Sequence, residues 1–128
     1  MSDLSETMKI VLAETFSFYM KAHYFHWNVE GPLFKVLHEL FRDIYEEVWA
    51  AVDTIAEHLR TLDVYAPCSY SRFKQLSTIV EEVNIPHPMD MVRQLESDNK
   101  TVIASLHKAM LAAEQENKVG IVNFLQVS

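Results

Sequence analysis

The run of residues 33–62 constrains the fold of this chain more than any other segment. Its apolar side chains recur at intervals that alternate between three and four residues, which is the pattern of a helix packed in a bundle. Neither glycine nor proline interrupts the run, and the 128 residues contain only 2 Gly and 4 Pro, so a sheet protein rich in turns is not expected. We predict a helix over 32–62 with the core stripe Phe34, Leu37, Phe41, Ile44, Val48, Val52, Ile55, Leu59 and Leu62.

The rest of the chain predicts two more long helices and two short ones. A first helix is expected over 4–26, ending before Gly31 and Pro32, and a third long helix over 88–116. A connector over 63–88 carries a short helix at 71–83, and a short or truncated fourth helix starts near Lys118. We therefore predict an all-α, single-domain protein over 1–128. The buried stripe of the first helix is expected to be Leu4, Met8, Val11, Thr15, Phe18, Ala22 and Phe25.

Charge and cysteine content indicate which partners and which compartment are favoured. The formal net charge is −7, which favours cations over nucleic acid or anionic membranes. Cys68 is the only cysteine, so no intrachain disulfide can form and a reducing compartment fits. No signal peptide or membrane-spanning run is apparent, so the expected location is the cytoplasm and no membrane partner is expected.

Four metal-ligand side chains stand where one copy of the chain cannot bring them together. His26 closes the first helix, while His38, Asp53 and Glu57 belong to the second. Asp53 lies fifteen residues beyond His38, about 22 Å along the helix axis, whereas a metal bond is only about 2 Å long. Two copies arranged antiparallel across a two-fold axis could supply both ends.

A second face of the same helix supports this arrangement. His38, Tyr45, Trp49 and Ala56 lie about 80–100° round the helix from the core stripe, with Asp53 further round. Large apolar groups near the axis suit a subunit interface. Two imidazoles and two carboxylates suit iron or another borderline divalent ion. The alternative is that these residues are ordinary solvated or packing side chains. His23, one turn before His26, is expected either to support that ligand or to pack.

Three stretches carry a family resemblance. They are His23-Tyr-Phe-His-Trp-Asn-Val-Glu-Gly-Pro-Leu-Phe, then Leu37-His-Glu-Leu-Phe, and then Asp53-Thr-Ile-Ala-Glu57. Together they resemble the Dps family, the starvation-inducible mini-ferritins. The resemblance implies a ferritin-like four-helix bundle with a short helix between its second and third long helices. It also implies a homo-oligomeric shell of twelve subunits.

The resemblance further implies a ferroxidase site at a two-fold interface. His26 and His38 match the histidines from one subunit, and Asp53 and Glu57 match the acids from its neighbour. The implied reaction is oxidation of ferrous iron by hydrogen peroxide or O2, with storage of the product as ferric mineral. The expected cofactor is therefore iron, in a di-iron or a single-iron site.

The chain departs from the family pattern at two positions that bear on function. Arg42 stands four residues after His38, where family members often carry an acid, and a guanidinium would repel a second cation. The first eight residues hold Asp3 and Glu6 but no basic residue, so DNA binding by the N-terminal segment is not expected. The alternatives to an iron-storing ferroxidase are a nucleoid-compacting DNA-binding protein and an inactive structural shell subunit.

Overall fold

The computed structural model describes residues 3–126, which form five helices and no strand. The three long helices are α1 (Asp3–Asn28), α2 (Phe34–Thr61) and α4 (Pro88–Gln115). The two short ones are α3 (Tyr70–Leu76) and α5 (Val119–Gln126). The all-α prediction and the order of long and short helices are confirmed. The predicted domain limits, Met1 and Ser128, lie outside the described residues.

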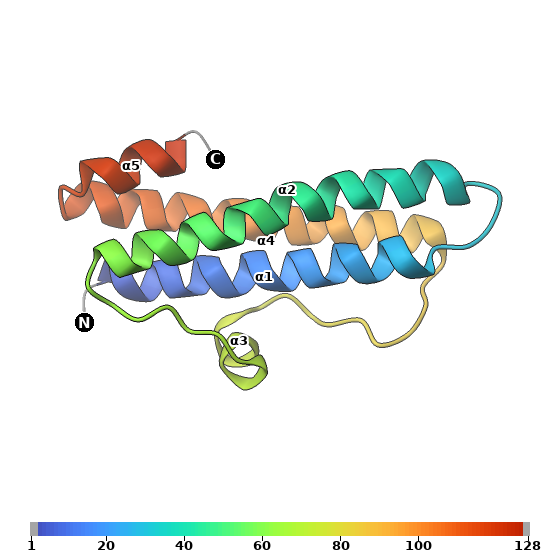
Figure 1. The fold of residues 1–128 in the computed structure, drawn as a ribbon, viewed down its shortest axis with the longest axis horizontal. Helices are drawn as coiled ribbons and strands as arrows, with labels where there is room; N and C mark the ends of the chain where they lie inside the picture. Colours follow the sequence, from blue (N-terminus) through green and yellow to red (C-terminus); the bar gives the residue numbers. More distant parts are fainter. Residues whose placement is uncertain (1–2, 127–128) are drawn as a thin grey trace.

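The long helices lie side by side along the length of the bundle (Figure 1). α1 and α2 form an antiparallel hairpin, whereas α2 and α4 run in the same direction because the connector returns along the whole bundle. α1 contacts α2, α3 and α4, and α5 folds back against the end of α4. None of the described helices is both long and apolar enough to cross a membrane.

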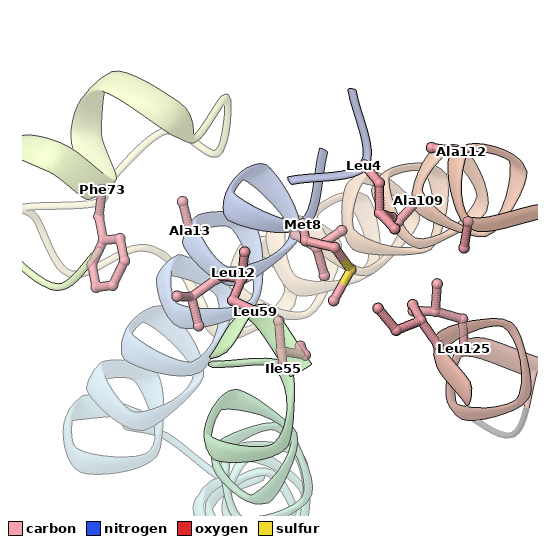
Figure 2. Close-up of a cluster of buried hydrophobic side chains, with 13 residues drawn as sticks. Leu4, Met8, Leu12, Ala13, Ile55, Leu59, Phe73, Ala109, Ala112 and Leu125 are labelled. Carbon is pink, nitrogen blue, oxygen red and sulfur yellow. The ribbon is translucent and has the colours of Figure 1, made fainter. Parts of the chain in front are cut away.

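The buried face of α1 agrees with the prediction. All seven residues of its expected stripe, from Leu4 to Phe25, are at most 5% exposed. Figure 2 shows the cluster at one end of the bundle, where α1 side chains meet side chains of α2, α4 and α5. Full burial of one large apolar side chain contributes roughly 1.5–3 kcal/mol, so this stripe stabilises the bundle.

The predicted core stripe of α2 is only partly buried. Leu37, Phe41, Ile55 and Leu59 are buried, but Phe34 is 44% exposed, so its assignment to the core was wrong. Phe34 belongs to the first turn of α2, at the end of the bundle, where its ring stacks on His38 with centroids 4.8 Å apart.

An open apolar groove explains why the middle of the α2 stripe is half-exposed. The groove has a volume of ≈ 530 Å³ and lies between α2 and α4, with Ile44, Val48, Val92 and Phe124 among its lining residues. The main partner of α2 is α1 rather than α4, so the apolar side chains of α2 that face this groove are only partly buried.

The connector helix is shorter than predicted because a buried carboxylate ends it. The expected helix was 71–83, yet α3 stops at Leu76. Glu14 of α1 is 2% exposed and accepts hydrogen bonds from the Ser77 hydroxyl at 2.7 Å, the Thr78 hydroxyl at 2.8 Å and the Thr78 amide at 3.1 Å. These bonds hold Ser77 in an extended conformation, with ψ at 142°, so the helix cannot continue.

Replacing Glu14 with Gln should loosen the connector. The amide has one acceptor oxygen instead of two and carries no charge, so we expect a loss of about 2–3 kcal/mol. Urea unfolding measures this loss, and faster hydrogen exchange at Thr78 would locate it. Glu81→Gln, at an exposed connector position, is the matched control and should change stability by less than about 0.5 kcal/mol. Equal stability of the two variants would contradict this role for Glu14.

Candidate metal centre

A tight turn between α1 and α2 positions the first two candidate ligands. The Val29 amide donates to the Phe25 carbonyl at 3.0 Å as α1 ends, and the Phe34 amide donates to the Gly31 carbonyl at 3.0 Å as α2 begins. Gly31 has φ of 104°, a backbone conformation that side chains with a Cβ rarely adopt. The chain therefore reverses within a few residues and lays His38 beside His26.

Reciprocal hydrogen bonds hold the two histidines together. His26 Nδ1 lies 2.7 Å from the His38 carbonyl oxygen, and His38 Nδ1 lies 2.7 Å from the His26 carbonyl oxygen. A carbonyl oxygen can only accept, so both Nδ1 atoms donate, and in the neutral form of each ring the Nε2 atom keeps a lone pair. An imidazole oriented in this way by a backbone carbonyl is the usual form of a metal-binding histidine.

The packing of the two rings adds to this orientation. Their centroids are 3.8 Å apart with an interplanar angle of 18°. His26 is 5% exposed and His38 is half-buried. His38 also satisfies one of the last carbonyl groups of α1, which has no partner within the helix. The two imidazoles are thus fixed in position before any ligand binds.

The two candidate acids lie elsewhere on α2 and point to solvent. Asp53 and Glu57 are both exposed, one turn apart. A hydrogen bond to Asp53, together with the negative charge of Asp53, raises the pKa of the Glu57 carboxyl. Within residues 3–126 no three His, Cys, Asp or Glu side chains come close enough to hold a metal ion. The structure therefore brings His26 and His38 together and leaves Asp53 and Glu57 apart from them.

Aromatic side chains pack directly against the histidine pair. The Tyr45 ring stacks on His23 with centroids 3.8 Å apart at 8°, and its centroid is 5.1 Å from that of His26. The Tyr19 hydroxyl lies 2.8 Å from His23 Nδ1. Burial lowers the pKa of the His23 imidazole and raises the pKa of the Tyr19 phenol. The His23 tautomer sets which of the two atoms donates the hydrogen bond between them.

Sequence reasoning did not detect the hydrogen bond between Tyr19 and His23. The signal was their spacing of four residues, which sets side chains on neighbouring turns of one helix face. His23 makes no hydrogen bond to His26 and instead links Tyr19 to Tyr45. Of the two expectations for His23, packing is the one that these contacts fit.

Several large apolar side chains remain exposed near the histidine pair. Trp27 is 65% exposed and Trp49 is 53% exposed. Arg42, on α2 between His38 and Trp49, is also exposed. Other exposed apolar residues of the same region are Leu33, Phe34, Val36 and Leu40. Apolar side chains gathered in this way mark a surface that binds another molecule.

Comparison with known proteins identifies the family. Residues 6–127 match the ferritin-like domain family. The chain is 28% identical over 112 residues to DNA protection during starvation protein 2 of Bacillus anthracis, covering 88% of this chain and 77% of that relative. The chain belongs to the Dps family.

A second relative and a solved structure extend the comparison. A low temperature-induced protein of Nostoc sp. is 36% identical over 96 residues, which cover 74% of this chain and 54% of the relative. The chain thus spans about half the length of that curated relative. The crystal structure of a Dps protein from Bacillus brevis superposes with a TM-score of 0.91 at 25% identity, covering 97% of this chain and 83% of that one. The ferritin-like fold that the sequence predicted is confirmed.

Proposed function

We propose that this Dps-family chain oxidises ferrous iron with hydrogen peroxide and stores the product as ferric mineral inside a homo-oligomeric shell. The observation that carries the proposal is the pair of reciprocal hydrogen bonds between His26 and His38, which leaves two Nε2 lone pairs free. Ferrous iron is the substrate. It accepts imidazole nitrogen and carboxylate oxygen ligands together, as a borderline ion does.

The acids of the site come from a second subunit in this proposal. Along α2, Asp53 is about 22 Å and Glu57 about 28 Å from His38, so an antiparallel α2 of another copy is needed to place them beside His26 and His38. The same contact would bury Trp49, which is 53% exposed in the single chain. A shell of twelve subunits, as the family resemblance implies, would contain this dimer as its building unit.

The acids of the proposed site and Arg42 have different effects on bound iron. The carboxylates of Asp53 and Glu57 stabilise a ferric ion more than a ferrous one, because its charge is larger. In the overall reaction, two ferrous ions, one hydrogen peroxide and two protons yield two ferric ions and two water molecules. The guanidinium of Arg42 cannot ligate and repels a second cation, which favours one ferrous ion at a time over a di-iron site.

Ferrous iron oxidation by single variants tests the proposal. With hydrogen peroxide under anaerobic conditions, His38→Ala should form ferric product about 10- to 100-fold more slowly than wild type, the loss typical of damage to a metal site. His107→Ala, which removes an exposed histidine of α4, is the matched control and should keep the wild-type rate. Equal rates for wild type, both variants and protein-free iron would overturn the proposal, and repetition with O2 would identify the preferred oxidant.

A further inference from the structure

We propose that Arg42 forms an ion pair with the partner subunit's Asp53 across the two-fold axis, and that its guanidinium takes the place of a second metal ion. The inference rests on the proposed function, because it needs the antiparallel contact between two copies of α2. Ferrous iron must then compete with a permanent cation for one of its carboxylates. Arg42 thereby limits the site to one ferrous ion and links the two subunits while iron is absent.

The register that assembles the proposed metal site also places Arg42 beside Asp53. An antiparallel contact that sets His38 level with the partner's Glu57 has its two-fold axis midway between these positions, between residues 47 and 48. Arg42 and Asp53 are equally far from that axis, on either side of it, so Arg42 of each subunit comes level with Asp53 of the other. Within one chain the same two residues are about 16 Å apart along the helix axis, so only a second copy can bring them together.

Arg42 and Asp53 also lie on the same face of α2. The eleven residues from one to the other make three turns and about 20° more. Trp49, which is 53% exposed, lies within about 40° of both. A face that meets itself across a two-fold axis therefore brings Arg42 toward the partner's Asp53. Packed helices lie about 8–10 Å apart, a distance that the long arginine side chain can span.

Neither Arg42 nor Asp53 has an oppositely charged partner within the described part of one chain. Glu39 and Glu46 stand three and four residues from Arg42 on the same helix, yet no ion pair of Arg42 or Asp53 is found among residues 3–126. Arg93 of α4, by contrast, pairs with an acid three residues away. Both charges are therefore available to a second subunit.

The charge of the facing helices gives Arg42 a second role. Residues 39–57 contain six acids and a single base, Arg42. Two copies of this segment would repel each other across an interface unless the negative charge were compensated. A guanidinium matches a carboxylate with two parallel hydrogen bonds and cannot lose its proton. Arg42 therefore stabilises the contact and competes with a metal ion for the partner's Asp53.

Exchange of the two charges tests the ion pair in the absence of metal. Association of the full chain is measured by analytical ultracentrifugation in the presence of a chelator. Arg42→Glu should weaken association at least about tenfold, and Arg42→Glu with Asp53→Arg should return it close to wild type. The matched control is Arg42→Glu with Asp43→Arg, which has the same net charge but places the new cation about 80° further round α2, so association should stay weak.

Two results of this experiment would overturn the ion pair. One is unchanged association of Arg42→Glu, and the other is equal restoration by the two double variants. All the substituted positions are exposed in the single chain, and circular dichroism confirms that the variants are folded.

Zinc binding measures the competition for Asp53 without an oxidation step, because zinc has no redox chemistry. Isothermal titration calorimetry of assembled Arg42→Ala should give a zinc affinity at least about tenfold above wild type, since no guanidinium has to be displaced. Lys35→Ala removes an exposed positive charge from the same helix, and it should change the affinity less than about threefold because salt screens exposed charges. Equal gains in the two variants would show that Arg42 does not compete at Asp53.

Ferrous iron oxidation by wild type separates this inference from the proposed function. If wild type accelerates the oxidation but exchange of the charges does not restore association, only the role of Arg42 is overturned. If exchange restores association but wild type oxidises iron no faster than protein-free iron and peroxide, the proposed function fails and the ion pair between subunits stands.

Discussion

Subunits carrying His38→Ala, assembled together with subunits carrying Asp53→Asn, should regain about a quarter of the wild-type rate of ferrous iron oxidation, although each variant alone is much slower than that. In a two-fold dimer each site takes its histidines from one subunit and its acids from the other. A mixed dimer therefore has one site with both defects and one site with none.

The expected fraction follows from random pairing. About half of the dimers are mixed, and each mixed dimer has one intact site of two. Co-expression gives this random mixture, and the rate of ferric formation with hydrogen peroxide is measured on it. Purification through two different affinity tags confirms that mixed assemblies are present. His38→Ala assembled with His26→Ala is the matched control. Both defects then affect the histidine pair, so no site is restored.

The rate of the mixed assemblies distinguishes a site shared between two subunits from a site formed within one subunit. If all four ligands belonged to one subunit, every subunit of the mixture would carry a defect and the rate would stay at the level of the single variants. Restoration in the control mixture, by contrast, would show that the two histidines do not serve the same site. Either outcome would contradict the arrangement proposed for His26, His38, Asp53 and Glu57.

Asp98→Ala should lower the free energy of unfolding by about 3–5 kcal/mol, because it leaves the ammonium of Lys21 buried without its partner. Lys21 Nζ of α1 lies 2.9 Å from Asp98 Oδ2 of α4, and the two side chains are 7% and 10% exposed. Burial raises the pKa of the Asp98 carboxyl, while the hydrogen bond and charge of Lys21 oppose that rise. Urea unfolding at matched protein concentration measures the loss.

Two comparisons distinguish this buried pair from an ordinary surface pair. Asp90→Ala removes an exposed partner of Arg93 on the same helix, and it should cost less than about 1 kcal/mol. The double variant Lys21→Met with Asp98→Leu should come close to wild-type stability, since apolar side chains of similar size often replace a buried pair without loss. A cost for Asp98→Ala no greater than that for Asp90→Ala would show that Lys21 is not trapped by burial.

Local periodicity accounts for the parts of the fold that were predicted correctly. The spacing of apolar residues in α1 and α4, and the breakers Gly31 and Pro32, are properties of neighbouring residues, so they could be read along the chain. The same holds for the distance between His38 and Asp53, because the rise of a helix is constant. Phe34 was assigned wrongly because periodicity gives the direction of a side chain but not whether another helix lies opposite.

The sequence by itself therefore determined the helices, the buried face of α1, and the separation of the histidines from the acids. Only the tertiary structure decided the protonation of His26 and His38, the pairing of Tyr19 with His23 beneath Tyr45, and the end of α3. The physical reason is that most of these features depend on which segments meet across the bundle. The Glu14 carboxylate is 63 residues from Ser77 in the chain, yet their oxygen atoms are 2.7 Å apart.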